Sequence, residues 1–475
     1  MSLNGKDKEL HLVMFPFFAF GHISPFVQLS NKLSSYPGIK ISFLAASTSV
    51  SRIETMLNHT ATTTIIPLTL PHVDGLPEGV ENTSQTSPET VELLKVALDL
   101  MQPQVKTLLT NLKPNLVIFD FAHMWLPEIA CDLGIKTIFF SVFMASCMAF
   151  LTSWFTHDKL PTIEEMKKPP LGLPGYIRGE FKFFPALQLP KTITLDTFEA
   201  EDVIYVFKSF QGTPSVFDRL VKCFNGCNAI VFKSCREMEG PYIDYITNQV
   251  KKPVLLIGPV VPEPHSGELD ETWANWLSHF PAKSVIYCSF GSETFLKDDQ
   301  IRELSIGLEL TGLPFFLVLN FPANLDSSAE LKRTLPEGFV ERVKDRGVVH
   351  SGWVQQQHIL AHQSVGCYVC HAGFGSVIEG LVNDCQLVML PLKTDQFSNA
   401  KVIALDWKAG VQVNRRNEDG YFGKDDVFGA VKSVMMDTNK EPAKSIRENH
   451  NKWRDFFQND EIHNKYIADF VDKLK

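Results

Sequence analysis

The sequence predicts an α/β protein with two Rossmann-like domains that face each other across a cleft. Short apolar runs bounded by turn residues recur along the chain, and such runs are typical of buried strands. Helical patterns lie between several of them, and this alternation is typical of a doubly wound parallel sheet. A stretch rich in proline and glycine, residues 258–267, separates two such series and indicates a linker between two domains.

The first series of elements occupies residues 1–250. Its predicted strands are His11–Phe15, Ile39–Ala46, Thr63–Leu68, Leu116–Phe119, Thr137–Val142 and Ala229–Phe232. Ser24 followed by Pro25 predicts a helix start, because serine caps helix N-termini and proline suits the first helical position. Further helices are predicted for Thr90–Leu109, Met124–Leu133 and Ala145–Phe155. Residues 137–155 carry no charge, but serine and threonine interrupt the run, which favours a strand and a helix over a membrane span.

The second series occupies residues 268–442. Its predicted strands are Ser284–Ser289, Phe315–Leu319, Gly347–His350, Val365–Val369 and Leu387–Leu390. Helices are predicted for Asp298–Thr311, His358–Ala361 and Val377–Asn383, and the end of the chain, Ala443–Lys475, is also predicted to be helical. Doubly wound sheets bind ligands beyond the carboxyl ends of their strands, so the loops at those ends form the candidate site.

The composition narrows the classes of partner and compartment. The formal net charge of −9 argues against nucleic acid as a partner, because an acidic surface repels phosphates. No apolar stretch precedes Leu10, so no secretory signal peptide is predicted. Nine cysteines, an odd number, favour free thiols in a reducing compartment. We expect a cytoplasmic monomer without an integral membrane segment.

The clearest functional signal is a glycine-containing loop between a strand and a helix. The predicted strand Val365–Val369 leads into the loop His371–Ser376, and a helix is predicted from Val377. Free backbone N–H groups and the positive end of the helix dipole make such a junction a site for phosphate. Glu379, on the predicted first turn, could hold both hydroxyls of a ribose. The alternative interpretation is that Gly373 and Gly375 serve only a tight turn and that the Glu379 carboxylate interacts with the helix dipole.

Other nucleotide and metal motifs do not fit. Gly373-Phe374-Gly375 lacks the third glycine of the dinucleotide fingerprint, which weakens the alternative of a nicotinamide-dependent oxidoreductase. The sequence has no GxxxxGK[ST] phosphate-binding loop and no Asp-x-Asp pair. His358 and His362 lie four residues apart but lack a third ligand, so no metal site is predicted.

The segment from Trp353 to Gln396 resembles the signature box of plant UDP-dependent glycosyltransferases. The residues that carry the resemblance, at the family's spacing, are Trp353, Gln356, His371, Gly373, Ser376, Glu379, Asp395 and Gln396. Similarity covers almost the whole chain, including Gly21-His22 and Ser289–Ser292. The resemblance implies the GT-B fold, in which two Rossmann-like domains face across a cleft. It also implies that residues 1–250, braced by the helical end 443–475, bind the acceptor and residues 268–442 bind the UDP-sugar.

The family's roles transfer onto matching residues of this chain. Trp353 would stack on uracil with help from Gln356, and Glu379 would hold the ribose. His371, Ser376 and Ser292 would bind the diphosphate. Asp395 and Gln396 would bind the sugar hydroxyls. The full set of donor-binding residues expected is Gly21, Ser292, Trp353, Val354, Gln356, His371, Gly373, Phe374, Gly375, Ser376, Glu379, Asp395 and Gln396. The UDP-sugar is a co-substrate, and no tightly bound cofactor is expected.

Phe374-Gly375 departs from the commoner pattern of the family, in which tryptophan and asparagine occupy these two positions. The Phe-Gly form resembles the branch that adds a second sugar to flavonoid and anthocyanin glycosides, and His72–Pro77 points to the same branch. The expected acceptor is therefore the sugar of a phenolic 3-O-glycoside, attacked at its 2''-hydroxyl. Transfer directly to an aglycone hydroxyl is the alternative. UDP-glucose is the expected donor, with UDP-rhamnose and UDP-xylose as alternatives.

A hydroxyl needs a general base before it can displace UDP, and histidine suits this task near neutral pH. His22 lies in the predicted loop after the first strand. Asp120 directly follows the strand Leu116–Phe119, where it could orient the imidazole. A solvated loop histidine and a turn aspartate are the plainer interpretation of these residues. The resemblance implies that they form a catalytic pair for a single displacement that inverts the anomeric centre.

The acceptor pocket is expected in the first half of the chain, whose loops are rich in aromatic residues that a flat phenol could stack on. The expected acceptor-binding residues are Phe17, Phe20, Ser141, Phe143 and Phe184. A nucleotide-sugar-binding regulator without catalysis is a further alternative, against which the presence of both His22 and Asp120 argues.

Overall fold

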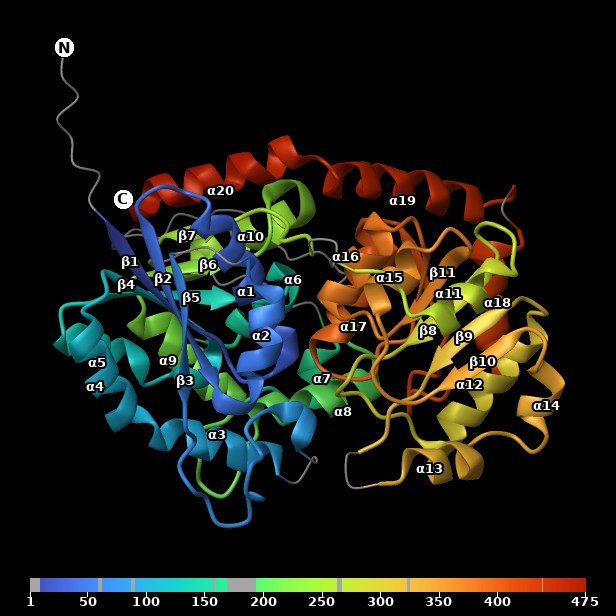
Figure 1. The fold of residues 1–475 in the computed structure, drawn as a ribbon, viewed down its shortest axis with the longest axis horizontal. Coiled ribbons are helices and arrows are strands. Elements are labelled where there is room, and N and C mark those ends of the chain that lie inside the picture. Colours follow the sequence, from blue (N-terminus) through green and yellow to red (C-terminus); the bar gives the residue numbers. More distant parts are fainter. Residues whose placement is uncertain are drawn as a thin grey trace.

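The computed structural model contains two parallel β-sheets, one in each half of the chain. It describes residues 9–58, 62–86, 90–155, 159–168, 194–262, 267–322, 325–437 and 439–475. The seven-stranded sheet has the order β3-β2-β1-β4-β5-β6-β7, and the six-stranded sheet has the order β10-β9-β8-β11-β12-β13. Helices cover both faces of each sheet, and the two domains lie side by side (Figure 1).

The first sheet reverses its strand order between β1 and β4. Its strands are β1 (Leu10–Phe15), β2 (Ile39–Ala46), β3 (Thr63–Leu68), β4 (Leu116–Phe119), β5 (Lys136–Ser141), β6 (Ala229–Phe232) and β7 (Val254–Leu256). The helices of this half are α1 (Phe20–Ser34), α2 (Val50–Met56), α3 (Val91–Leu100), α4 (Gln102–Leu112), α5 (Leu126–Asp132), α6 (Ala145–Thr152), α7 (Ile163–Met166), α8 (Thr197–Val203), α9 (Val216–Gly226) and α10 (Arg236–Gln249). The loops after β1 and β4 diverge at this reversal, which opens the crevice where such folds bind ligands.

The second sheet reverses its order between β8 and β11. Its strands are β8 (Val285–Ser289), β9 (Phe315–Val318), β10 (Gly347–His350), β11 (Val365–Cys370), β12 (Gln386–Met389) and β13 (Gly410–Gln412). Its helices are α11 (Glu271–Ser278), α12 (Asp298–Leu310), α13 (Ser327–Thr334), α14 (Phe339–Val343), α15 (Gln356–Ala361), α16 (Phe374–Val382), α17 (Asp395–Lys401) and α18 (Lys424–Met435). The loops after β8 and β11 therefore border a second crevice.

The strands form where the sequence predicts them because both faces of a parallel sheet are covered by helices. Residues 12–15 of β1 are all fully buried, so the strand is a continuous apolar run rather than an alternating one. Every predicted strand is confirmed to within one residue at either end. The sequence pattern did not predict β7 and β13. Each has only three residues, too few to give a recognisable run, and β7 lies between residue 250 and the linker.

The predicted start of the first helix at Ser24 and Pro25 is wrong. The backbone N–H groups of His22 and Ile23 both donate to the Ala19 carbonyl, at 2.8 Å each, so α1 already turns at Phe20 and contains Pro25. Proline is tolerated there because it costs one intrahelical hydrogen bond near the helix start, where few are yet made. As a consequence, His22 lies in the first turn of α1 and not in a loop.

Three other predicted helices of the first domain differ in their bounds. The pattern from Thr90 to Leu109 forms two helices, α3 and α4, which break at Met101 because Pro103, in the first turn of α4, has no backbone N–H to continue the hydrogen bonds of α3. The helix predicted from Met124 begins two residues later, after the short 3₁₀ turn Phe121–His123. The helix predicted to reach Phe155 ends at Thr152.

The end of the chain forms two helices that cross both domains. α19 (Ala443–Phe457) packs on the second domain, where Trp453 stacks on Trp407 with ring centroids 4.2 Å apart. α20 (Asp460–Leu474) returns to the first domain, where Phe470 is buried in the core and the Tyr466 hydroxyl donates to Glu237 at 2.7 Å. Figure 1 shows both helices along one side of the molecule. Within the described ranges, none of the helices has the length and apolar character that crossing a bilayer requires.

A buried carboxylate holds the start of α6. Glu239, on α10, is fully buried and accepts hydrogen bonds from the backbone N–H groups of Ala145 and Ser146, at 2.9 Å each, and from the Ser234 hydroxyl at 2.7 Å. Burial raises the pKa of Glu239, and these hydrogen bonds oppose that rise. The carboxylate thus satisfies N–H groups that the first turn of a helix leaves free.

Replacing Glu239 with alanine should therefore destabilise the protein. Three buried donors would lose their acceptor, and we expect the free energy of unfolding to fall by roughly 2–4 kcal/mol. Urea denaturation of Glu239→Ala against wild type measures this. Glu418→Gln, a change at an exposed glutamate, is the control and should stay within about 0.5 kcal/mol of wild type. Equal stabilities for Glu239→Ala and the control would contradict the proposed capping role.

Candidate functional site

A histidine and an aspartate meet at the crevice of the first sheet. Asp120 follows the last residue of β4 and is 1% exposed. Its Oδ2 atom accepts a hydrogen bond from His22 Nδ1 at 2.7 Å and from the Phe17 backbone N–H at 3.2 Å. Its Oδ1 atom accepts from the Phe121 backbone N–H at 2.7 Å. Because the carboxylate can only accept, His22 Nδ1 carries the proton and Nε2 has the free lone pair.

Three phenylalanine rings surround the His22 imidazole. The ring centroids of Phe17, Phe121 and Phe143 lie 5.4, 5.5 and 5.3 Å from the imidazole centroid, and the Phe17 ring is perpendicular to the imidazole. The side chain of His22 keeps 14% of its surface exposed, whereas Phe17 and Phe121 are nearly buried. The rings limit the imidazole to one orientation, and its exposed part faces the crevice.

A second layer of buried groups fixes the two loops that carry this pair. His123 is fully buried, stacks on Phe15 with ring centroids 3.6 Å apart, and bonds through Nε2 to the Pro16 carbonyl at 3.0 Å. Arg219 is fully buried and donates to Asp99 at 2.8 Å and to the Ala122 carbonyl at 3.0 Å. The loops after β1 and β4 are thus tied to each other and to α9. The sequence pattern gave no signal for either residue, because both partners are distant in the chain.

The glycine loop of the second domain surrounds an imidazole. A Cβ added to Gly373 would lie 2.5 Å from His371 Nε2, and one added to Gly291 would lie 3.2 Å from His371 Cε1. Both positions therefore need glycine so that the backbone can approach the ring. Burial, with a smaller effect of Lys393, lowers the pKa of His371 to about 4, so the ring is neutral at pH 7. Ser292 follows Gly291 in the loop after β8.

The predicted extent of the loop His371–Ser376 is wrong at its second half. α16 begins at Phe374 with Gly373 as its N-cap, so Gly375 and half-buried Ser376 lie in the first turn. The helix can start this early because the buried ring of Phe374 packs into the core. The free N–H groups of this turn lie beside His371, an arrangement suited to an anion.

Glu379 lies in the second turn of α16, not in the first as predicted from the sequence, because the helix starts earlier. Its two carboxylate oxygens accept from Gln356 Nε2 at 2.6 Å and from Gln357 Nε2 at 3.1 Å. The Tyr287 hydroxyl donates to Gln356 Oε1 at 3.3 Å. Burial raises the pKa of Glu379, and the two amides oppose that rise. Gln357 and Tyr287 were not predicted as part of the site.

Trp353 is the most exposed large apolar side chain of the site, with 74% of its surface accessible. It lies in the loop between β10 and α15, next to buried Val354. Asn320 ties this loop to the one after β8: its amide donates to the Gly291 carbonyl at 2.9 Å and accepts from the Gly352 N–H at 3.1 Å. A nucleotide base can stack on an exposed indole that a fixed loop holds in place.

The pair Asp395-Gln396 begins α17 and faces the first domain. Asp395 bonds to the Asn399 amide at 3.0 Å and to the Thr394 hydroxyl at 3.2 Å. Thr394 has φ 45°, a strained value for threonine, and Asp202 of the first domain accepts its N–H at 2.7 Å. Gln396 Oε1 accepts two backbone N–H groups, which leaves its amide N–H groups for a ligand.

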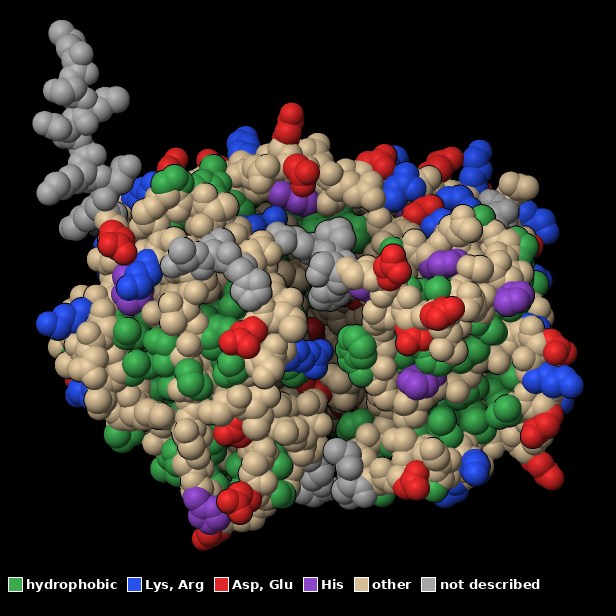
Figure 2. All heavy atoms as spheres, viewed as in Figure 1, with side chains coloured by type: hydrophobic (Ala, Val, Ile, Leu, Met, Phe, Trp, Pro, Cys, Tyr) green, Lys and Arg blue, Asp and Glu red, His purple; other side chains and the backbone are tan. Residues whose placement is uncertain are grey.

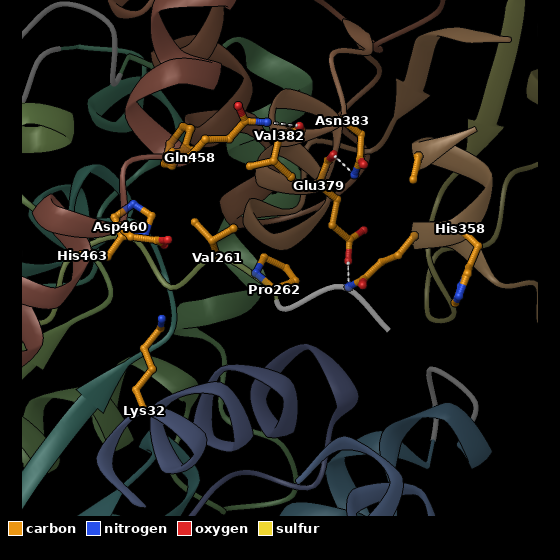
Figure 3. A pocket seen from close by; sticks show the side chains of 13 residues that line it. Lys32, Val261, Pro262, His358, Glu379, Val382, Asn383, Gln458, Asp460 and His463 are labelled. Atoms are coloured by element: carbon orange, nitrogen blue, oxygen red, sulfur yellow. Dashed lines mark hydrogen bonds between the residues drawn. The ribbon is translucent and has the colours of Figure 1, made fainter. Parts of the chain in front are cut away.

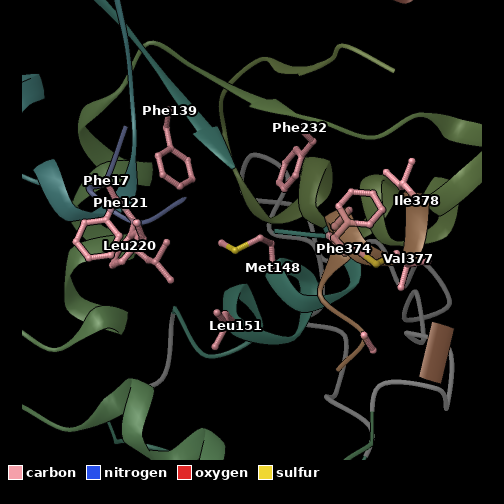
Figure 4. Packing of buried hydrophobic residues seen from close by; sticks show 14 of the residues in the cluster. Phe17, Phe121, Phe139, Met148, Leu151, Leu220, Phe232, Phe374, Val377 and Ile378 are labelled. Atoms are coloured by element: carbon pink, nitrogen blue, oxygen red, sulfur yellow. The ribbon is translucent and has the colours of Figure 1, made fainter. Parts of the chain in front are cut away.

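The two crevices face one another. Burial raises the pKa of Asp395, while hydrogen bonds from Asn399 and Thr394 oppose that rise, as does the imidazole of His22 across the cleft when it is protonated. The Thr83 hydroxyl donates to Glu293 at 2.5 Å, and Lys393 Nζ donates to the Glu293 carbonyl at 2.8 Å. Buried apolar residues of both domains also form one cluster, in which Phe374 of α16 lies near Phe232 of β6 (Figure 4).

The predicted acceptor residues have different surroundings. Phe17 and half-buried Phe143 lie beside His22. Ser141 is 1% exposed at the end of β5. The Phe20 ring lies 3.4 Å from the guanidinium carbon of Arg52, and Gly21 precedes His22 in the first turn of α1. Phe184 lies outside the described residues.

A cavity of about 470 Å³ lies where the two domains, the linker and the tail meet. Glu379 points toward it from α16 and Lys32 from α1, while His463 and Asp460 come from α20 (Figure 3). Gln357 and His358 also line it. The Glu379 side chain therefore borders a pocket that residues of both domains line. No cluster of histidine, cysteine, aspartate or glutamate suited to a metal was found in the described part of the chain.

Comparison with known proteins identifies the family. Residues 264–452 match the family model of UDP-glucoronosyl and UDP-glucosyl transferases. The chain is 71% identical to UDP-glycosyltransferase 79A2 of Stevia rebaudiana over 476 residues, which cover 100% of both chains. The chain belongs to the UDP-glycosyltransferase family. It is also 60% identical to anthocyanidin-3-O-glucoside rhamnosyltransferase of Petunia hybrida, over 98% of this chain and 96% of that protein.

The architecture is the GT-B fold of UDP-glycosyltransferases. A solved structure of Phytolacca americana UGT2, complexed with UDP-2fluoro-glucose and pterostilbene, has a TM-score of 0.75, covers 98% of this chain and 99% of its own, and is 24% identical. At that identity the likeness concerns the fold. The family match and the sequence relatives, rather than this likeness in fold, show that the protein is a UDP-glycosyltransferase with a UDP-sugar as donor.

The buried histidines of this UDP-glycosyltransferase predict a loss of stability in acid. Burial lowers the pKa of His123 to about 4 from 6.5, and that of His450 likewise to about 4. The unfolded chain gains these protons below pH 6.5 but the folded protein does not until about pH 4. The free energy of unfolding should therefore fall as the pH drops from 6.5 to 4, by up to about 1.4 kcal/mol per pH unit for each such group.

Urea denaturation at pH 7, 6, 5 and 4 measures this slope. His123→Gln should reduce the slope, because one group that titrates only on unfolding has been removed. His72→Gln is the matched control, since its side chain is 81% exposed, and it should keep the wild-type slope. An unchanged slope in His123→Gln would contradict the assignment of a buried neutral imidazole.

Proposed function

We propose that this UDP-glycosyltransferase adds a sugar to the 2''-hydroxyl of a phenolic 3-O-glycoside, with inversion at the anomeric carbon and with His22 as the general base. The observation that carries the proposal is the 2.7 Å bond from His22 Nδ1 to a buried carboxylate, which leaves Nε2 as a proton acceptor in the cleft. The partly exposed imidazole faces the crevice on the side of Asp395.

The reaction follows from this geometry. His22 Nε2 takes the proton of the acceptor hydroxyl while the oxygen forms a bond to the anomeric carbon. The bond from that carbon to the UDP oxygen breaks, and UDP leaves with the electron pair. Asp120 stabilises the imidazolium that results, and it keeps the correct ring nitrogen free before the reaction. Because attack and departure occur on opposite faces, the anomeric configuration inverts.

The donor would lie along the second domain. Trp353 and Val354 would hold the uracil with Gln356, and Glu379 would hold the ribose at the cavity where its oxygens are already fixed by two amides. The first turn of α16, with Ser376 and Gly375, would bind the diphosphate together with His371 and Ser292. Donors fixed in advance stabilise the charge that develops on the leaving diphosphate. Asp395 and Gln396 would bind the sugar hydroxyls.

The nature of the acceptor is supported by the relatives. The Petunia hybrida protein, 60% identical, is named for action on an anthocyanidin-3-O-glucoside. The aromatic rings of Phe17, Phe121 and Phe143 give the first domain walls on which a flat phenol could stack.

We infer UDP-glucose as the donor, with UDP-rhamnose and UDP-xylose as alternatives. The nine unpaired cysteines support a reducing compartment, which we take to be the cytoplasm, and we infer a monomer.

Removing the base should abolish most of the turnover. For His22→Ala we expect kcat to fall roughly 10²–10⁴-fold, because proton removal no longer assists attack. The dissociation constant for UDP, measured by calorimetry, should stay within about two-fold of wild type, since His22 lies in the other domain. His72→Ala is the control and should retain full turnover. Near-normal turnover in His22→Ala would refute the role of the base.

A screen of substrates tests the acceptor and the donor. UDP-glucose, UDP-rhamnose and UDP-xylose would each be offered with flavonoid aglycones and with their 3-O-glucosides, and products would be followed by mass spectrometry. We expect a single sugar gain on the glucosides and none on the aglycones. Nuclear magnetic resonance of the product should place the new bond at the 2''-oxygen with inverted configuration. Gain on the aglycones alone would overturn the proposed acceptor class.

A further inference from the structure

A buried lysine of the first domain contacts the start of α16 in the second domain. Lys233 directly follows β6, at the carboxyl edge of the first sheet, and is 5% exposed. Its Nζ atom lies 4.6 Å from the centroid of the Phe374 ring, the first residue of α16. Figure 4 shows Phe232 and Phe374 among the buried side chains of the cluster that joins the two domains. The ammonium is therefore held at the cleft by a cation–π contact.

The groups that face this ammonium come from several elements. Asp395 of α17 and Glu239 of α10 are the charges that act on it, and no ion pair or hydrogen bond of Lys233 occurs among the described residues. Glu239 is already occupied by Ala145, Ser146 and Ser234. Cys147 of α6 lies near the same two carboxylates, and burial raises the pKa of its thiol, so it adds no charge. In the part of the chain that the structure describes, the N–H donors of Lys233 thus have no acceptor.

Burial of the Lys233 ammonium without hydrogen-bond acceptors costs free energy unless a bound ligand supplies the acceptors. A buried ammonium without acceptors is strongly disfavoured, and burial indeed lowers the pKa of Lys233 to about 8, although Asp395 and Glu239 oppose this. Next to the Phe374 ring, Gly375 leaves open space, since a Cβ added there would meet no atom within 4 Å. Sugar hydroxyls bind to hydrogen-bond donors and acceptors beside an aromatic face. Here the ammonium of Lys233 supplies the donors, Asp395 the acceptor and Phe374 the aromatic face.

We propose that Lys233 is a donor-recognition residue, whose ammonium donates hydrogen bonds to hydroxyls of the sugar carried by UDP, from the side of the cleft opposite Asp395 and Gln396. This inference rests on the proposed function, which assigns the sugar to Asp395. A neutral sugar fits better than a uronic acid, because Asp395 would repel a second carboxylate while an ammonium and a carboxylate together match a set of hydroxyls. The first domain would then bind the donor sugar as well as the acceptor.

Binding of the donor can be compared with binding of UDP alone. In Lys233→Met, which keeps the length of the side chain without its charge, we expect the dissociation constant for UDP-glucose to rise roughly 10- to 100-fold, as for loss of hydrogen bonds from a charged donor. The dissociation constant for UDP should stay within about two-fold, because Lys233 contacts only the sugar. Lys208→Met, at an exposed lysine, should leave both constants unchanged. Calorimetry with UDP-glucose and with UDP, on wild type and on both variants, measures all six dissociation constants without turnover.

The pH dependence provides a second test. In wild type the affinity for UDP-glucose should fall above about pH 8 as Lys233 loses its proton. Lys233→Arg should remain charged and show no such fall, and Lys233→Met should be weak at every pH. A merely structural lysine would weaken UDP and UDP-glucose equally, and that outcome would overturn the proposal, as would unchanged UDP-glucose affinity in Lys233→Met. Tighter binding of UDP-glucuronate than of UDP-glucose by wild type would overturn the preference for a neutral sugar.

Failure of the proposed function would look different. If wild type binds UDP-glucose more tightly than UDP but transfers no sugar to any acceptor of the screen, the proposed acceptor class fails while Lys233 is still tested by calorimetry. If wild type transfers sugar and the KM for UDP-glucose is the same in Lys233→Met, only the inference on Lys233 fails. Selective loss of UDP-glucose affinity, with kcat changed less than KM, supports it.

Discussion

The geometry of the site depends on the burial of one carboxylate. Asp120 is 1% exposed, and a charge removed from water in this way must be met by hydrogen-bond donors. The backbone N–H groups of Phe17 and Phe121 and the imidazole of His22 supply them. These three donors come from the loop after β1, the turn after β4 and the first turn of α1. A single buried group therefore fixes the relative positions of all three segments at the crevice.

The second constraint is that both domains share one apolar cluster and several polar contacts. Phe374 packs with residues of the first domain, and Asp202 of that domain accepts the N–H of strained Thr394, directly before Asp395. The pair proposed to bind the sugar, Asp395 and Gln396, is thus positioned partly by the first domain. Cores transmit shifts because they are close-packed, so movement of one domain would change the surroundings of His22 and Asp395 together.

The strands could be predicted because parallel sheets are buried on both faces, so each strand is a local apolar run that needs no knowledge of its neighbours. The start of α1 could not. Ser24 and Pro25 carry the local features of a helix start, yet the Ala19 carbonyl receives two N–H groups earlier in the chain. The same holds for α16, which begins at Phe374, before Gly375, because the Phe374 ring is buried. Tertiary packing overrode the local preference in both cases.

The sequence by itself determined the fold class and the family and predicted the residue types of the candidate site, because spacing within a segment such as Trp353–Gln396 is a property of the chain alone. Only the tertiary structure decided which distant groups meet. His22 and Asp120 are 98 residues apart, and the sequence gave no signal for Gln357 and Lys233, or for Arg219, which is buried behind the site. The physical reason is that hydrogen bonds and burial act over a few ångströms in space, and no local pattern records which segments will be that close.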